Sequence, residues 1–400
     1  MKILYSSNAF WANSGYGTQG KSLLPRLADL EIVGGRQNVA MFAWYGLQGG
    51  IHSVEGFTVY PSGNDPYGND IIGAHAKNFK ADVVITLIDA WVLKDIQKQV
   101  EPALYVPWFP VDHYPVPGKV LQGIADSKYP ICYSKDGVKA CAEKNVNVDY
   151  IPHGIETSVF NVVEDREAVQ NFKRNVLQAE DFLAVMVAAN KGYPDRKAFQ
   201  FQLRAFAKYV KENNSKAKVY LHTEPSTMYG GIDLVELVRL LGIENNVIFP
   251  DRYMNFVGIP SEHLNMVYNA ADCLLSATMG EGFGIPIIEA QSAGTKVIVS
   301  DFSSMPELVE KGYIVEPLDY FFTPMNAYQC IPDWKGIYES IVDCANNPLS
   351  VPEMIDLQNT IHQKYSWDII VQNYWKPFLE NLPINQSPKI EKRQSKVTTK

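Results

Sequence analysis

One short segment in the second half of the chain combines two carboxylates with a glycine-rich loop. Residues 281–289 read Glu-Gly-Phe-Gly-Ile-Pro-Ile-Ile-Glu, between an apolar run at 273–275 and a helical pattern at 285–293. Backbone N–H groups of such a loop, together with the positive end of the helix, bind phosphate groups. One of the carboxylates, Glu281 or Glu289, can then hold sugar hydroxyls and the other a ribose. The segment therefore predicts a diphosphate site that includes the backbone of Gly282, Phe283 and Gly284.

Three cations follow another predicted strand, at 182–188. Residues 189–197 read Ala-Asn-Lys-Gly-Tyr-Pro-Asp-Arg-Lys, and their position directly after a buried strand favours a ligand site over solvated loop charges. Positive charge here would neutralise a diphosphate. The cationic pair is either Lys191 with Lys197 or Arg196 with Lys197, and the sequence leaves both open. A lysine in place of an arginine loses the bidentate hydrogen-bonding geometry.

Further candidates follow strands elsewhere in the chain. The run Asn-Ser-Gly-Tyr-Gly-Thr at 13–18 lies between the first predicted strand and a helix. Its glycines, Gly15 and Gly17, let the backbone approach a ligand, although a plain turn explains the pair equally well. Asp112 and His113 follow the fifth predicted strand. Arg252 follows a strand at 247–249 and is assigned to the site by topology alone.

Alternating apolar and amphipathic runs predict the elements that position these loops. In the first half, strands are expected at 2–5, 38–43, 58–60, 83–87, 103–106 and 129–133, with helices at 17–30 and 136–144. In the second half, strands are expected at 182–188, 218–222, 247–249, 273–275 and 296–299, with helices at 198–212, 233–241, 262–270 and 285–293. Such alternation indicates doubly wound parallel sheets, which bind ligands at the carboxyl ends of their strands.

The expected organisation is two Rossmann-like domains, residues 1–152 and 153–350, facing each other across a cleft. Residues 333–382 have helical patterns, with Ser366 as a helix N-cap, and the helices in 351–382 are expected to return to the N-terminal domain. Residues 383–400 carry several lysines and few apolar residues. This composition predicts a flexible basic tail.

Composition narrows the class of protein. The 400 residues are 46% hydrophobic and 20% charged, as in soluble globular proteins, and the net charge of −8 disfavours nucleic acid as the main partner. The five cysteines form no C-x-x-C pair and no D-x-D occurs, so neither a disulfide framework nor a metal site is expected. No apolar run is long enough for a signal peptide or a membrane span, which predicts a cytoplasmic protein without an integral membrane segment.

The run from Glu281 to Glu289 resembles the E-x(7)-E motif of the retaining glycosyltransferase family 4. Residues 294–301 and 305–309 resemble the segment that follows the motif in that family, and the likeness is strongest over 150–310. The resemblance implies the GT-B fold, an α/β architecture of two facing Rossmann-like domains with C-terminal helices packing back. It also implies that Glu281 lies near the donor sugar and that Glu289 holds the nucleotide ribose.

The same resemblance assigns the remaining candidates. The cationic pair contacts the donor diphosphate, while the loop containing Gly15 and Gly17 approaches it from the opposite domain. One subgroup of the family has an aspartate followed by a glycine at this place. Asp112 matches the aspartate, and His113 departs from the pattern. The catalytic candidates are therefore Glu281, Asp112, His113 and Lys197, and the donor-binding candidates are Gly15, Gly17, Lys191, Arg196, Arg252, Gly282, Phe283, Gly284 and Glu289.

The implied activity is transfer of a hexose-type sugar from a nucleoside-diphosphate sugar, UDP- or GDP-linked, to a hydroxyl acceptor, with retention and without a metal or cofactor. The acceptor is left open among a glycan, a lipid-linked glycan, a protein and a modified nucleic acid. Residues 44–56, 61–70 and 89–93 are expected to contact it. The alternatives are a GT-B nucleotide-sugar epimerase, a sugar phosphorylase and a non-catalytic nucleotide-sugar-binding protein.

Overall fold

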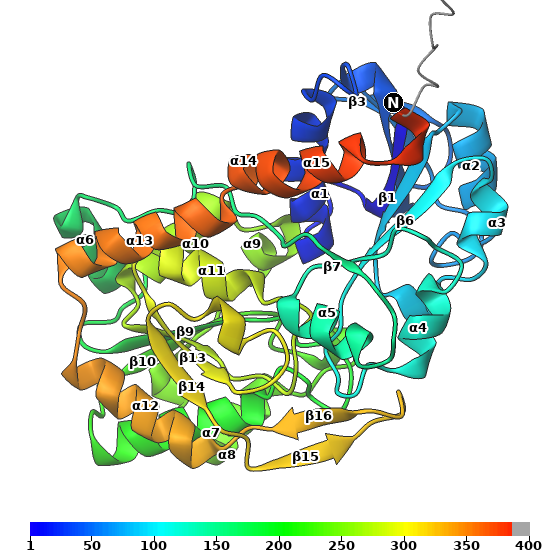
Figure 1. The fold of residues 1–400 in the computed structure, drawn as a ribbon. Helices are drawn as coiled ribbons and strands as arrows, with labels where there is room; N and C mark the ends of the chain where they lie inside the picture. Colours follow the sequence, from blue (N-terminus) through cyan, green and yellow to red (C-terminus); the bar gives the residue numbers. More distant parts are fainter. Residues whose placement is uncertain (386–400) are drawn as a thin grey trace, which may run out of the picture.

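Two β-sheets, one in each half of the chain, organise the computed structural model, which describes residues 1–385 (Figure 1). The first sheet has the strand order β3-β4-β2-β1-β5-β6-β7-β8 and is parallel except for the β3–β4 pair. Its strands are β1 (Ile3–Asn8), β2 (Val39–Tyr45), β3 (His52–Val54), β4 (Phe57–Tyr60), β5 (Val83–Leu87), β6 (Leu104–Phe109), β7 (Ile131–Cys132) and β8 (Asp149–Tyr150).

The helices of this half connect successive strands. Helix α1 begins where the Ser14 side chain accepts a hydrogen bond from the backbone N–H of Gly17, the N-cap interaction that serines favour. The helical elements are α1 (Gly15–Ala28), η1 (Arg36–Asn38), α2 (Ile72–Phe79), η2 (Ala90–Val92), α3 (Ile96–Val100), α4 (Gly118–Ile124) and α5 (Lys135–Ala142).

The second sheet is wholly parallel, with the order β11-β10-β9-β12-β13-β14. Its central strands are continuous buried apolar runs, as expected when helices cover both faces of a parallel sheet. The strands are β9 (Leu183–Val187), β10 (Lys218–His222), β11 (Val247–Ile248), β12 (Cys273–Ser276), β13 (Lys296–Ser300) and β14 (Gly312–Val315).

Helices again alternate with these strands, and an antiparallel hairpin follows them. The helical elements are α6 (Arg166–Asn175), α7 (Phe199–Glu212), η3 (Thr227–Tyr229), α8 (Leu234–Leu241), η4 (Glu244–Asn246), α9 (Arg252–Val257), α10 (Ser261–Ala270), α11 (Ile285–Ser292) and η5 (Pro306–Leu308). The hairpin consists of β15 (Asp319–Phe322) and β16 (Tyr328–Ile331). Its strand β16 reaches the first half of the chain, because Tyr114 and Tyr328 exchange two backbone hydrogen bonds of 3.0 and 2.8 Å.

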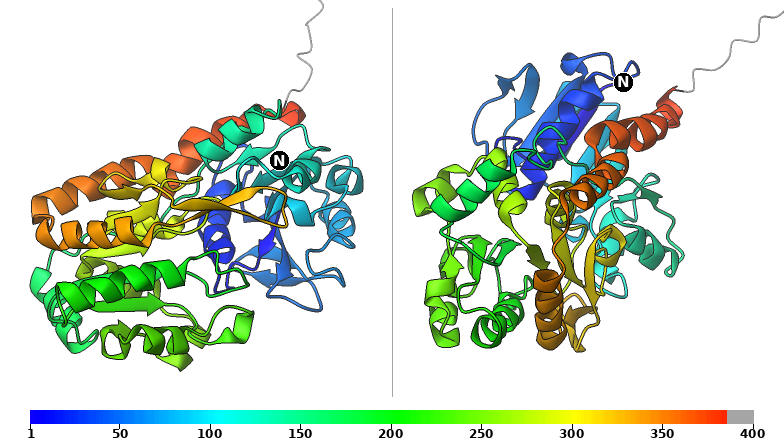
Figure 2. Two further views of the ribbon diagram at one scale, coloured as in Figure 1. Left: turned by 90° about the horizontal axis from the view of Figure 1, so that it is seen from below. Right: turned by 90° about the vertical axis from the view of Figure 1, so that its left-hand side faces the viewer.

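The C-terminal helices run from the second sheet back to the first, as both views of Figure 2 show in orange and red. They are α12 (Trp334–Asn346), α13 (Val351–Tyr365), α14 (Trp367–Ile370), the π-helical η6 (Val371–Trp375), α15 (Lys376–Glu380) and η7 (Pro383–Asn385). Helix α14 and η6 contact α1, and Arg26 of α1 forms ion pairs with Glu156 at 2.7 Å and Asp368 at 2.8 Å. Ser366 caps α14 as predicted.

Most predicted strands and helices occur within a few residues of their expected positions. The predicted strand at 129–133 shrinks to Ile131–Cys132, whereas that at 2–5 extends to Asn8. The sequence prediction missed β3, β14 and the β15–β16 hairpin, which are short and lie at sheet edges or outside the two main sheets. The proposed domain boundaries remain predictions, and residues 386–400 of the expected basic tail lie outside the described residues.

Candidate active site

Two adjacent strands of the second sheet bring Glu281 and two cations together. Strands β9 and β12 are parallel neighbours, so the loops that leave their carboxyl ends meet. Lys197 Nζ lies 2.6 Å from Glu281 Oε1, and Arg196 Nη1 lies 3.4 Å from Glu281 Oε2. Arg196 also donates to the Gly280 carbonyl, and its own carbonyl accepts from Met279 N–H at 2.9 Å. The two loops therefore form one hydrogen-bonded unit.

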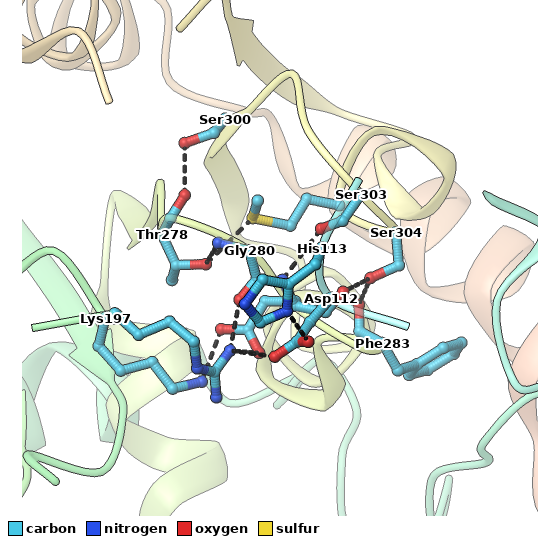
Figure 3. Close-up of polar contacts among 12 residues, drawn as sticks. Asp112, His113, Lys197, Thr278, Gly280, Phe283, Ser300, Ser303 and Ser304 are labelled. Atoms are coloured by element: carbon cyan, nitrogen blue, oxygen red, sulfur yellow. Dashed lines mark hydrogen bonds and ion pairs between the residues drawn. The ribbon is translucent and has the colours of Figure 1, made fainter. Parts of the chain in front are cut away.

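The first half of the chain supplies a second carboxylate to this cluster. Asp112 lies in the loop after β6, and its Oδ2 atom is 3.7 Å from Arg196 Nη1. His113 Nδ1 lies 2.6 Å from Asp112 Oδ1, and Figure 3 shows both side chains converging with Lys197. Arg196 thus links carboxylates from the two halves, Asp112 and Glu281.

Both carboxylates of the cluster are ionised. Burial raises the pKa of Glu281, but the charges of Lys197 and Arg196 outweigh it and hold the pKa below its usual value. Burial also raises the pKa of Asp112, but the hydrogen bond from His113 and the charge of Arg196 outweigh burial and lower that pKa below its usual value. The site therefore presents fixed charges of both signs in a largely water-excluded setting, where electrostatic interactions are strong.

The loop between β12 and α11 is held by two serines that the sequence analysis did not single out. Ser303 Oγ accepts from the Glu281 N–H at 2.9 Å, and Ser304 Oγ donates to the carbonyls of Glu281 and Phe283 at 2.8 and 2.7 Å (Figure 3). Within residues 1–385, no acceptor is found for the backbone N–H groups of Gly282, Phe283 and Gly284. These donors are available to an anion at the start of α11.

The glycines of this loop also permit close packing between the two halves. A Cβ atom on Gly280 would lie 2.4 Å from the Asp112 carbonyl oxygen, and one on Gly282 would lie 2.4 Å from Pro110 Cβ. Gly284 has a φ of +110°, which only glycine adopts without strain. The sequence analysis explained these glycines by ligand approach alone, and the packing adds a second reason.

Phe283 occupies a different environment from its neighbours. Its side chain is 3% exposed and packs edge-on against the rings of Tyr133, His153 and Tyr365. Only its backbone can therefore contact a donor. His153 lies in the same aromatic cluster, where burial lowers its pKa to about 3.

The two glycines of the N-terminal loop differ in their surroundings. A Cβ atom on Gly15 would meet nothing within 4 Å, whereas one on Gly17 would lie 2.5 Å from the Ala12 carbonyl oxygen. Packing therefore requires glycine at position 17, while the open space at Gly15 can admit a ligand. Tyr16, between them, places its hydroxyl 3.5 Å from that of Tyr133.

The remaining predicted residues lie outside the Glu281 cluster. The side chains of Lys191 and Arg252 are exposed, and Lys191 lies in a loop that bridges to Gly230. Glu289 is buried on α11, where its Oε2 atom accepts a hydrogen bond from Tyr268 at 3.1 Å. Burial raises the pKa of Glu289 to about 7.

Asp89, which the sequence analysis placed only at the start of an acceptor loop, has a more specific setting. It is half-buried after β5, and the charges of Asp112, Arg196 and Lys191 all act on it. Burial and the neighbouring Asp112 raise the pKa of Asp89 to about 6. Sequence alone offers no signal for this carboxylate, because its charged neighbours come from two distant segments, at 112–113 and 191–196.

Part of the second half of the chain matches a known protein family. Residues 183–324, which include Glu281, Glu289 and the cationic pair, match the family model described as glycosyl transferases group 1. This segment is similar to glycosyl transferases of group 1. An uncharacterised glycosyltransferase of Methanocaldococcus jannaschii is 27% identical over 233 residues, covering 58% of this chain and 53% of the relative. The O-antigen chain mannosyltransferase B of Escherichia coli is 36% identical over 89 residues, covering 22% of this chain and 23% of the relative.

The chain thus spans about half or less of the length of these curated relatives. A solved structure extends the likeness to both halves of the chain. The HepE protein of Anabaena, in complex with UDP and glucose, superposes with a TM-score of 0.69 at 15% identity, covering 96% of this chain and all of that one. The two-domain GT-B fold predicted from the sequence is thereby confirmed.

Residues 1–385 show neither a metal-ligand cluster nor a membrane-spanning helix. No three His, Cys, Asp or Glu side chains gather there as metal ligands. No helix in that range is long and apolar enough to cross a membrane.

Proposed function

We propose that the protein transfers a glycosyl group from a nucleoside-diphosphate sugar to a hydroxyl acceptor, with retention at the anomeric carbon. The observation that carries this proposal is the Lys197–Glu281–Arg196 cluster in the loops before α11, with Asp112 of the first half beside Arg196. The match of residues 183–324 to glycosyl transferases group 1 supports the reaction class. The complex of HepE with UDP and glucose supports a nucleotide-linked donor.

In this proposal the donor diphosphate lies between the cations and the free N–H groups of residues 282–284. Arg196 and Lys197 offset the charge that develops on the leaving phosphate, and the dipole of α11 adds to their effect. These interactions grow stronger as the glycosidic bond breaks, so they favour the transition state over the bound donor. Metal ions need not take part.

The carboxylates then have distinct roles. Glu281, fixed by Lys197, holds the hydroxyls of the donor sugar, while Glu289 accepts hydrogen bonds from the ribose. The departing phosphate accepts the proton of the acceptor hydroxyl as that hydroxyl attacks the anomeric carbon from the same face. Asp112, oriented by His113, faces the sugar from the acceptor side. Membership of family 4 and a hexose-type donor sugar also belong to this proposal.

The test begins with thermal-shift screening of UDP-, GDP- and ADP-sugars, because a bound donor stabilises the folded state by mass action. We would then measure nucleotide release from the donor that stabilises the protein. NMR would give the anomeric configuration of the product. Release of a nucleoside diphosphate with a retained anomer supports the proposal. Formation of a sugar phosphate from inorganic phosphate would indicate a phosphorylase. An isomerised nucleotide sugar would indicate an epimerase. Binding without turnover would indicate a non-catalytic protein.

A further inference from the structure

The β15–β16 hairpin belongs to the second half of the chain, and its turn packs against the first half. The hairpin spans residues 319–331, and Figure 1 shows it below α4 and α5. Met325, in the turn, packs against a buried hydrophobic cluster of the first half that includes Val111 and Val116. The turn is therefore anchored beside the loop that carries Asp112.

Backbone groups of β16 that face away from β15 bind both halves of the chain. Tyr328 exchanges two hydrogen bonds with Tyr114 of the first half, of 2.8 and 3.0 Å. Two residues along the strand, Cys330 N–H donates to the Met279 carbonyl of the second half at 2.9 Å. Met279 N–H donates in turn to the Arg196 carbonyl at 2.9 Å. Because residues two apart in a strand direct their backbone groups to the same side, one strand reaches both loops of the site.

The bonds to β16 hold the loop that carries Asp112. Within residues 1–385, the loop 111–116 makes no backbone–backbone hydrogen bond to another segment except the two between Tyr114 and Tyr328. Asp112 lies two residues before Tyr114, and its carboxylate is 3.7 Å from Arg196 Nη1. The place of this carboxylate beside the guanidinium therefore depends on the contact with β16.

The two loops of the site meet backbone to backbone. A Cβ atom on Gly280 would lie 2.4 Å from the Asp112 carbonyl oxygen, so no side chain lies between the loops at this point. A shift of either loop would change the distance between Asp112 and Arg196. A misplacement of about 1 Å in a reaction centre can cost about 10²-fold in rate.

We propose that β16 is a positioning strand, which sets the distance between Asp112 of the first half and Arg196 of the second through the backbone of Tyr328. Tyr328 is a positioning residue, because its side chain is 44% exposed and its backbone makes the contact. This inference rests on the proposed glycosyl transfer, since that reaction gives the Asp112–Arg196 pair its role.

Proline substitution distinguishes the backbone of Tyr328 from its side chain, because proline has no N–H. Tyr328→Pro removes the 2.8 Å bond to Tyr114 and should lower kcat about tenfold or more. Affinity for the free nucleoside diphosphate should change far less, since the second half binds it in the proposed function. Tyr328→Ala keeps the backbone bond and should retain kcat.

Phe322→Pro is the matched control on the neighbouring strand. Phe322 stands directly opposite Tyr328 on β15. Because the Tyr328 N–H faces Tyr114, this is a non-hydrogen-bonded pair, and the Phe322 N–H points away from β16. Proline at such an edge position removes no hydrogen bond of the hairpin, so Phe322→Pro should leave kcat unchanged.

A double-mutant cycle separates positioning from a general structural role. Asp112→Asn should lower kcat in the wild-type protein but lower it little further in Tyr328→Pro, because Asp112 is already displaced there. Hydrogen exchange of residues 110–117, measured by mass spectrometry, should become faster in Tyr328→Pro and stay unchanged in Phe322→Pro. This second measurement does not depend on turnover.

The anchor in the turn supplies a second variant, which carries the test if Tyr328→Pro does not fold. Met325→Asp puts a charge against the hydrophobic cluster of the first half, and should lower kcat and speed exchange of residues 110–117. Asn326 is an exposed neighbour in the same turn, and Asn326→Asp should change neither quantity.

Three results would overturn the inference. They are additive effects of Asp112→Asn and Tyr328→Pro on kcat, equal effects of Tyr328→Pro and Phe322→Pro, and equal effects of Met325→Asp and Asn326→Asp. Faster exchange of residues 110–117 in Tyr328→Pro, in a protein that transfers no glycosyl group from any nucleotide sugar, would uphold positioning by β16 and reject the transferase proposal instead.

Discussion

Glu281 and Lys197, separated by 84 positions in the sequence, form a 2.6 Å ion pair at the end of two neighbouring parallel strands. The pair fixes the orientation of the carboxylate that we propose to hold the donor sugar. Because Arg196 reaches the same carboxylate, removal of the Glu281 charge would leave two adjacent cations without their shared partner. Mutation of Glu281 therefore tests the centre of the proposed site.

Glu281→Gln should lower kcat by about 10²–10³-fold, because a neutral amide holds the sugar hydroxyls less firmly and no longer balances the two cations. Affinity for the free nucleoside diphosphate, measured by calorimetry, should change far less, since the nucleotide lacks the sugar. Glu262→Gln, an exposed glutamate of α10, is the control and should alter neither quantity. An equal loss of kcat and nucleotide affinity in Glu281→Gln would contradict the assignment.

The choice between the two cationic pairs can be made by alanine substitution. Lys197→Ala and Arg196→Ala should reduce kcat/KM for the donor strongly, because both side chains reach Glu281. Lys191→Ala should cost only about 0–1 kcal/mol in donor binding, as is usual for an exposed charge. Steady-state kinetics with the donor found by thermal shift would measure all three. A larger effect of Lys191→Ala than of Arg196→Ala would restore the Lys191–Lys197 pair.

The glycines of the N-terminal loop should separate folding from binding. Gly17→Ala should destabilise the protein by about 1–3 kcal/mol, since its Cβ would lie 2.5 Å from the Ala12 carbonyl oxygen. Gly15→Ala should leave the free energy of unfolding unchanged or raise it by about 0.5–1 kcal/mol, because helix α1 starts there in open space. Denaturant unfolding would measure the stability of each variant, and steady-state kinetics would measure its KM for the donor. A rise in donor KM without loss of stability in Gly15→Ala supports a ligand at this loop.

Glu289 should make stability fall as pH rises. Its pKa is about 7 in the folded protein against an ordinary value of 4.5, so folding takes up a proton between these two pH values. Stability is full below about pH 4.5 and declines through pH 7, by about 3 kcal/mol in all. Glu289→Gln should flatten this decline and stabilise the protein at pH 8, while weakening nucleotide binding through loss of the ribose partner.

Urea unfolding of Glu289→Gln at pH 5 and pH 8 would measure how its free energy of unfolding changes with pH. Glu262→Gln is the control and should show the same pH dependence as the wild-type protein. If the wild-type protein and Glu289→Gln lost stability in parallel between these two pH values, the buried glutamate would not be the titrating group.

Asp89 should govern the acidic limb of the activity profile. Burial and Asp112 raise its pKa to about 6, and the ionised form is the better hydrogen-bond acceptor. The value of kcat/KM for the acceptor should therefore rise as pH increases through about 6, and this limb should disappear in Asp89→Asn. Asp95 is an exposed neighbour in the same loop, and Asp95→Asn should retain the acidic limb. Persistence of the limb in Asp89→Asn would point to another group.

The sequence by itself determined the alternation of most of the longer strands and helices and the main candidates for the proposed donor site. Apolar periodicity located β5 and β10 to the residue and α7 to within one residue, because buried parallel strands and amphipathic helices leave strong local patterns. The Glu281–Glu289 motif could be recognised because its spacing lies within one loop and helix. Short edge strands such as β14 leave no comparable pattern, since their exposed faces impose little apolar periodicity.

Only the tertiary structure decided which of these groups meet. It paired Glu281 with both Arg196 and Lys197, left Lys191 exposed, and brought Asp112 to Arg196 from the other half of the chain. It also revealed Asp89, whose raised pKa depends on burial and on Asp112. The physical reason is that charge interactions act through space between segments far apart in sequence, whereas composition and periodicity report only on local neighbours.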